Sequence, residues 1–218
     1  SLDNFDAISY HPYTEGRRHP ARGHFRDVVQ SFYSKVESFG TVPPLWATEF
    51  GWFGLAYDAK KFVPYKNPFV AREILDEKES AEAYVQSICT AFANGVEKTF
   101  YFTLLEGNVL DRWLHGWVGP GGRSVELGFI AAATACDLIA DMQCLGQEII
   151  EGGLCQTKFS NTSKNMVVLW SEEKAKILNL PLTENCTVYD LYGNSIPLNF
   201  NNDGTFAEYQ LLLHTTSI

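Results

Sequence analysis

Two short stretches of the sequence carry side chains that can do acid–base or nucleophilic chemistry. Glu49 lies in the stretch Trp46–Trp52 (Trp-Ala-Thr-Glu-Phe-Gly-Trp), where a carboxylate ending a short apolar run can be held rigidly in a cleft and Gly51 lets the backbone turn sharply. His11-Pro-Tyr13 ends another apolar run; a Tyr hydroxyl can donate a hydrogen bond to Glu, and His can contact a substrate hydroxyl or the same network. An arbitrary Glu is more often an exposed loop residue, and His-Pro-Tyr is more often a plain turn. The elements that position these residues decide between the two interpretations.

From Phe5 to about Gln147 the apolar pattern alternates between strands and helices. This order predicts a parallel sheet with right-handed crossovers, and the third strand is apolar enough to be buried on both faces. Because the carboxyl ends of parallel strands share one edge, we expect the polar residues that follow the strands, Glu106 among them, to gather there. A long loop is expected up to about Leu75. The expected elements are strands at Phe5–Tyr10, Leu45–Thr48 and Val96–Leu105, and helices at His24–Phe39, Ala81–Asn94 (capped by Ser80) and Gly128–Cys144.

The remainder of the chain has a different pattern of short, alternating strands separated by turn residues. Strands at regular spacing with such turns are typical of an antiparallel β-sandwich. We therefore predict two domains, residues 1–147 and 148–218. The expected strands are Leu154–Phe159, Met166–Trp170, Ala175–Leu180, Thr187–Leu191 and Ala207–Leu213.

Composition and motifs exclude several classes of protein. The net charge of −9 without a basic stripe argues against a nucleic-acid partner, and no apolar stretch reaches the roughly 18 residues that suggest a membrane span. The five cysteines form no CxxC pair, and no nucleotide-binding motif or His-rich cluster occurs, so we expect no cofactor and no metal. The absence of a Gly-x-Ser-x-Gly elbow argues against a serine hydrolase.

The first residues of the chain and two glycosylation sequons bear on the extent of the protein and on its compartment. The chain begins Ser-Leu-Asp without an initiator Met, from which we expect a piece of a longer product. Two glycosylation sequons, at Asn161 and Asn185, indicate a secreted or lysosomal protein only if they are used, and the compartment otherwise stays open.

Three segments together resemble barrel strands six, seven and eight of the clan A glycoside hydrolases: Ile8–Tyr13, Pro44–Trp52 and Gly95–Leu104. These enzymes are (β/α)₈ barrels with a retaining mechanism. The later part of the chain, with its stretch Val188–Asn194, resembles the C-terminal sandwich of family thirty-nine and its relatives. The resemblance implies an α/β fold: a partial (β/α)₈ barrel of about three β/α units followed by an antiparallel β-sandwich, as the C-terminal part of an enzyme that cleaves O-glycosidic bonds.

The resemblance also implies roles for matching residues. Glu49 would be the nucleophile, Tyr13 would orient it, and His11 would line the sugar subsite. The family usually ends strand eight with a Trp that supports the sugar, whereas here that strand runs on to Glu106, and a Trp in the following loop is the alternative platform. The expected substrate-binding set is His11, Trp52, Glu106, Trp113 and Trp117.

The second catalytic carboxylate is missing from this pattern. Retaining hydrolysis needs two carboxyl groups about 5–5.5 Å apart, and no Asn-Glu pair suited to the acid/base role occurs. Glu106 could approach Glu49, although a loop Glu beside Arg112 is the favoured interpretation. A whole barrel takes about 250 residues. We therefore expect the isolated chain to be inactive, with an N-terminal half-barrel chain or another copy covering its open sheet edges. The alternative is a non-catalytic carbohydrate-binding or structural module derived from a glycosidase.

Overall fold

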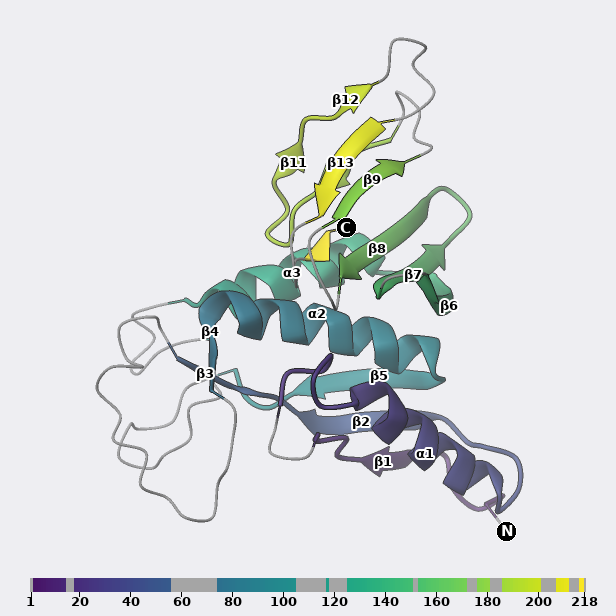
Figure 1. Cartoon of the computed structure of the whole chain (residues 1–218). Coiled ribbons are helices and arrows are strands. Elements are labelled where there is room, and N and C mark those ends of the chain that lie inside the picture. Colours follow the sequence, from purple (N-terminus) through teal and green to yellow (C-terminus); the bar gives the residue numbers. More distant parts are fainter. Residues whose placement is uncertain are drawn as a thin grey trace. The chain divides into compact units, whose positions relative to one another are not determined.

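The protein has a mixed α/β structure, which we describe from a computed structural model (Figure 1). The chain divides into two compact units, Ser1–Ile130 and Ala131–Ile218. Within the described residues the strands form separate sheets and no closed barrel. The structure describes residues 2–14, 18–55, 74–104, 117, 125–150, 153–171, 176–180, 186–200, 207–211 and 216–217.

The first unit is built on a three-stranded parallel sheet. Its strands are β1 (Ile8–Tyr10), β2 (Leu45–Phe50) and β5 (Val96–Tyr101), in the order β1-β2-β5 (Figure 1). The predicted parallel pairing of these three segments is confirmed. The middle strand runs two residues beyond its predicted end at Thr48, so Glu49 belongs to β2 itself.

A helix lies in each of the two connections between these parallel strands, as predicted. The first is α1 (Phe25–Glu37), which buries Phe25, Val29 and Val36, and the second is α2 (Glu77–Ala93). The loop expected before α2 also contains a short parallel pair, β3 (Phe53–Leu55) with β4 (Ile74–Asp76).

The predicted cap of α2 is wrong. Asp76, not Ser80, is the N-cap, because its side chain accepts a hydrogen bond from the Glu79 amide at 2.8 Å. The Glu79 side chain accepts in return from the Asp76 amide at 3.0 Å, which completes a capping box. Ser80 lies buried within the first turns of the helix.

The prediction that the third strand is buried on both faces is also wrong. Phe100 is 48% exposed, and Glu97 and Lys98 are exposed as well. The reason is that β5 lies at one end of the described three-stranded sheet, with α2 packed against it. Lys98 places its ammonium over the Trp46 ring, 4.4 Å from the centroid.

The second unit consists mainly of antiparallel strands, as predicted. The strands described there are β6 (Gln143–Ile150), β7 (Leu154–Ser160), β8 (Asn165–Ser171), β9 (Lys176–Leu180), β10 (Val188–Tyr189), β11 (Ser195–Ile196), β12 (Asn199–Phe200), β13 (Ala207–Leu211) and β14 (Thr216–Ser217). A four-stranded sheet has the order β14-β8-β7-β6, a three-stranded sheet has the order β12-β13-β9, and β10 pairs with β11. That these sheets form a sandwich stays a prediction.

The last predicted helix is shorter than expected. Helix α3 (Leu127–Ile139) ends before Asp141, whose φ of 57° is left-handed, and Cys144 already lies in β6. The predicted domain boundary after residue 147 therefore falls inside β6. The division into a barrel-derived and a sandwich domain stays a prediction.

The capping box of α2 gives a first testable prediction. Asp76→Ala removes the side chain that holds the Glu79 amide, and we expect the free energy of unfolding to fall by about 1 kcal/mol. Urea unfolding followed by circular dichroism measures the change. Asp137→Ala, at an exposed position of α3, is the matched control and should stay within about 0.5 kcal/mol of the wild type. Equal stability of the two variants would contradict the assigned cap.

Buried Glu82 predicts a pH dependence of stability. Burial raises the pKa of its carboxyl to about 8, and the Lys78 ammonium at 3.7 Å offsets only part of that rise. Between pH 4.5, the ordinary pKa, and about 8 the folded chain keeps a proton that the unfolded chain has lost. The free energy of unfolding should therefore fall as pH rises through this window, by up to about 1.4 kcal/mol per pH unit from this group.

Glu82→Gln tests this dependence, because it removes the titrating group and keeps the shape of the side chain. We expect a flatter stability profile between about pH 5 and about pH 8, and a more stable protein at the upper end. Glu97→Gln, which neutralises an exposed carboxylate, should leave the wild-type slope unchanged. Parallel profiles for Glu82→Gln and the wild type would show that Glu82 is ionised in the folded chain.

Candidate active site

Glu49 occupies the carboxyl end of β2, the middle strand of the parallel sheet. The pairing of β2 with β5 shifts register between Ala47 and Phe50, and such irregularities re-aim side chains near the ends of strands. The next residue, Phe50, is fully buried, whereas the Glu49 side chain is 30% exposed. A carboxylate accessible to solvent is thus attached to a firmly packed backbone.

Tyr13 and His11 lie beside the two oxygens of this carboxylate. The Tyr13 hydroxyl donates a hydrogen bond to Glu49 Oε1 at 2.6 Å, and His11 Nδ1 lies 3.7 Å from Oε2. The Tyr13 amide donates to the His11 carbonyl at 2.9 Å, which folds the two residues into a tight turn after β1. The structure therefore brings together the three residues that the sequence placed at this edge, while their catalytic roles stay predictions.

This arrangement provides an oriented carboxylate that a ligand can reach. The hydrogen bond from Tyr13 restricts the rotamer of Glu49, and the second oxygen faces the half-exposed imidazole of His11. A carboxylate held in this way can act as a nucleophile or as a base. Among the described residues, no group of three or more His, Cys, Asp and Glu side chains could hold a metal ion.

Gly51 is required for a reason other than the predicted sharp turn. A Cβ at this position would lie 2.3 Å from the carbonyl oxygen of Phe102, so only glycine permits this approach of the backbone. The Phe102 amide also donates to the Phe50 carbonyl at 2.8 Å. This contact continues the link between β2 and β5 past Glu49.

Trp52 and Trp117, which the resemblance places in the substrate-binding set, are both buried in this structure, and their role stays a prediction. Trp52 is 2% exposed, and its indole donates to the Arg18 carbonyl at 2.7 Å. Trp117 is 5% exposed and stacks on Tyr101 with ring centroids 3.8 Å apart. Both rings are buried because they complete an aromatic cluster with Phe50 and its neighbours. Trp113 and Glu106 lie outside the described residues.

The sequence analysis did not identify three features near Tyr13 and Glu49. Thr14 and the backbone carbonyl of Arg18 form a hydrogen bond of 2.8 Å directly beside Tyr13, and His19 is fully buried nearby in the chain. No sequence signal identifies a backbone carbonyl as a shared acceptor.

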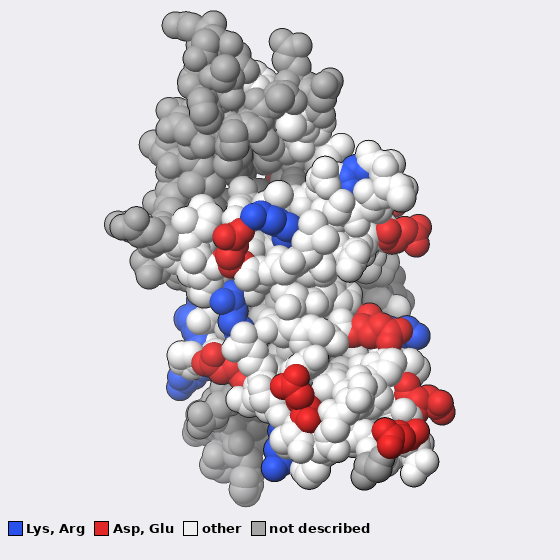
Figure 2. All heavy atoms as spheres, turned by 90° about the vertical axis from the view of Figure 1, so that its right-hand side faces the viewer, with Lys and Arg blue, Asp and Glu red and all other residues white. Residues whose placement is uncertain are grey.

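The surface charge is mixed on the face that Figure 2 shows. Among the described residues of that face, Lys and Arg side chains are scattered between Asp and Glu side chains and form no stripe. No helix in the described part of the chain is long and apolar enough to cross a membrane.

Comparison with known proteins finds likeness in structure and none in sequence. No protein-family model matches the chain, and no curated protein matches its sequence. A family 39 glycoside hydrolase from the gut symbiont Bacteroides cellulosilyticus WH2 superposes on 99% of this chain with a TM-score of 0.68 at 15% identity. A conserved exported protein from Bacteroides fragilis superposes on 98% of it, with a TM-score of 0.60 at 11% identity. A family 30 subfamily 8 xylanase, Xyn30A from Clostridium acetobutylicum, gives a TM-score of 0.51 over 98% of the chain at 10% identity.

The shared region is only part of these proteins. The chain spans 44% of the family 39 enzyme, 45% of the exported protein and 65% of the xylanase. At such low identity the likeness concerns the fold alone. The chain therefore has a glycoside hydrolase-like α/β fold over a length that is less than half of the first two neighbours.

Proposed function

We propose that this chain carries the nucleophile side of the active site of a retaining glycoside hydrolase, with Glu49 as the nucleophile. The observation that carries the proposal is the 2.6 Å hydrogen bond from the Tyr13 hydroxyl to Glu49 Oε1 at the carboxyl end of the middle parallel strand. Active sites of β/α folds are built at this edge. The glycoside hydrolase-like fold supports a carbohydrate substrate.

The roles follow from the contacts. In the first step Glu49 attacks the anomeric carbon, the bond to the leaving oxygen breaks, and that oxygen takes a proton from a separate acid. Tyr13 keeps Oε1 in place, so that Oε2 is the oxygen presented to the sugar. His11, with half of its side chain exposed beside Oε2, is placed to contact a sugar hydroxyl. Water then releases the sugar from Glu49 in the second step.

The acid/base carboxylate has to come from elsewhere, because retaining hydrolysis needs a second carboxyl about 5–5.5 Å from the nucleophile. We propose that this chain corresponds to the C-terminal part of a barrel enzyme, which its coverage of 44% of the family 39 neighbour supports. An N-terminal half-barrel chain or another copy would pair with the outer edges of β1 and β5, the two ends of the described parallel sheet. Glu106 is the alternative partner within the chain.

Binding of iminosugars tests Glu49 as the centre of a sugar site. A protonated iminosugar carries a positive charge close to the position that becomes positive in the transition state, so it should pair with the nucleophile. We expect saturable NMR shifts at His11 and Tyr13 with at least one member of a panel of differing ring configuration. Glu49→Gln should weaken that binding about tenfold or more.

The control for this titration is Glu97→Gln, which removes an exposed carboxylate of β5. Its affinity should equal that of the wild type. Shifts that avoid His11 and Tyr13, or that persist unchanged in Glu49→Gln, would contradict the proposal and favour a non-catalytic carbohydrate-binding module.

A separate prediction concerns turnover. We expect the 218-residue chain to release dinitrophenolate from 2,4-dinitrophenyl glycosides no faster than its Glu49→Gln variant. In our proposal the general acid comes from outside this chain, and general acid–base help is worth about 10²–10⁴-fold. Nucleophilic attack by Glu49 also needs the sugar held in a near-attack pose. The activated leaving group needs little acid help, which makes the assay a fair one. Turnover that disappears in Glu49→Gln would show a complete site within this chain, with Glu106 as the remaining candidate for the second carboxylate.

A further inference from the structure

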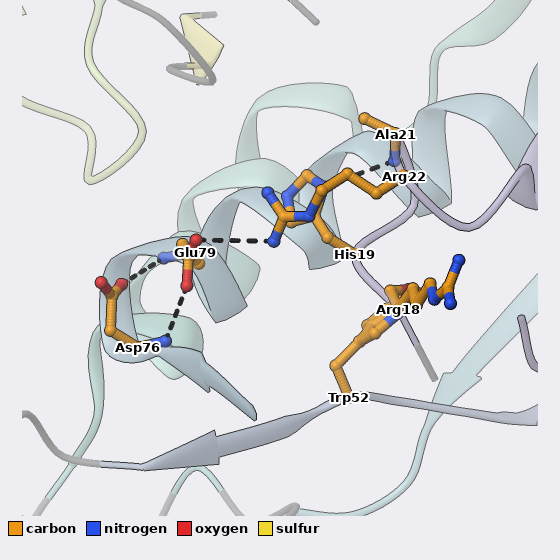
Figure 3. A network of polar contacts seen from close by, with 7 residues as sticks. All are labelled: Arg18, His19, Ala21, Arg22, Trp52, Asp76 and Glu79. Atoms are coloured by element: carbon orange, nitrogen blue, oxygen red, sulfur yellow. Dashed lines mark hydrogen bonds and ion pairs between the residues drawn. The ribbon is translucent and has the colours of Figure 1, made fainter. Parts of the chain in front are cut away.

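One backbone oxygen connects the two segments that carry the candidate site. The carbonyl of Arg18 accepts a hydrogen bond from Thr14 Oγ1 at 2.8 Å and another from Trp52 Nε1 at 2.7 Å (Figure 3 shows Arg18 with Trp52). Thr14 is the residue after Tyr13, and Trp52 lies three residues after Glu49. Tyr13 and Glu49 are therefore linked not only by their own 2.6 Å hydrogen bond but also through Thr14, the Arg18 carbonyl and Trp52.

Both donors are held where they stand. Trp52 is buried edge-to-face against the rings of Phe25 and Phe50, and an indole has a single N–H to donate. Thr14 is 4% exposed, and a Cβ added to Gly23 would lie 2.7 Å from the Cβ of Thr14. Gly23 thus allows the chain to close tightly over the Thr14 side chain.

The segment that carries the carbonyl is itself anchored. The His19 carbonyl accepts from the amides of Arg22 and Gly23 at 2.9 and 2.8 Å, and His19 Nδ1 accepts from the Ala21 amide. Arg22 reaches Glu79 at 3.5 Å, and Glu79 belongs to the capping box of α2 (Figure 3). The segment that carries the Arg18 carbonyl is therefore tied to the start of α2.

We infer that Thr14 and Trp52 are positioning residues, which hold Tyr13 against Glu49 through the Arg18 carbonyl. The catalytic meaning of this inference rests on the proposed function. Neither residue touches a sugar in this scheme: Thr14 fixes the backbone from which Tyr13 extends, and Trp52 fixes the backbone that follows Glu49. A displacement of about 1 Å in such supports is enough to impair a site.

The test reads the Tyr13–Glu49 contact directly in the 218-residue chain. Tyrosines carrying ¹³C at Cζ give one NMR signal each; Tyr13→Phe identifies the Tyr13 signal, and Glu49→Ala gives its position without the carboxylate. We expect Thr14→Val and Trp52→Phe each to move the Tyr13 signal toward the Glu49→Ala position. Thr14→Ser restores the hydroxyl and should return the signal to its wild-type position.

Thr157→Val is the matched control, because it removes another fully buried threonine hydroxyl, bonded to Gln147 at 2.9 Å in the second unit. It should lower stability and leave the Tyr13 signal in place. A wild-type Tyr13 signal in folded Thr14→Val and in folded Trp52→Phe would overturn the inference, and so would an equal shift in Thr157→Val. The two experiments can fail separately. A failure to bind iminosugars would contradict the proposed function, whereas the comparison of the Tyr13 signals among the variants needs no ligand and would still test the positioning roles of Thr14 and Trp52.

Discussion

The parallel pairing of β1 with β2 is the constraint on which the candidate site depends. Its register sets Tyr10 opposite Ala47, so the chain leaves β1 at the level from which Tyr13 reaches the Glu49 carboxylate. A slip by one residue would turn Glu49 to the other face of the sheet and break this contact. Packing protects the register, because Tyr10 stacks on Phe32 of α1 with ring centroids 4.0 Å apart and Ala47 is fully buried. The helix that covers the sheet therefore also determines which carboxylate the tyrosine meets.

Consecutive residues at the end of β2 have opposite environments, and this contrast gives the site its rigidity. Phe50 is buried among Phe25, Tyr84 and Tyr101, whereas the preceding Glu49 side chain is partly open to solvent. Deep burial of one residue limits the backbone freedom of the next, and a side chain on such a support needs only one or two contacts to be oriented. The aromatic cluster around Phe50 thus serves the packing beneath the site, and Trp52 and Trp117 are buried as parts of it.

The sequence predicted the parts of this structure that depend on local pattern and strand order. Three apolar runs with helices between them were enough to predict parallel strands, and their shared edge was enough to bring Tyr13 beside Glu49. Burial was harder to predict, since it depends on what covers a strand; the apolar run that begins at Thr99 suggested burial on both faces, and yet Phe100 is exposed at one end of the described sheet. The cap of α2 was predicted wrongly because Asp76 and Ser80, which lie four positions apart, are both residues that commonly cap helices. Only the reciprocal hydrogen bonds between Asp76 and Glu79 decide between them.

Fold likeness and site geometry support the functional proposal in different ways. A fold shared at 15% identity is compatible with many activities, so the superposition on a glycoside hydrolase cannot by itself assign chemistry to any residue. The Tyr13–Glu49 hydrogen bond and the nearby His11 come from contacts within this chain and do not depend on that comparison. These contacts lie at the carboxyl end of the middle parallel strand, where β/α folds build their sites. Glu49 is therefore the residue at which the proposal stands or fails, because its carboxylate is the group that the proposed mechanism uses.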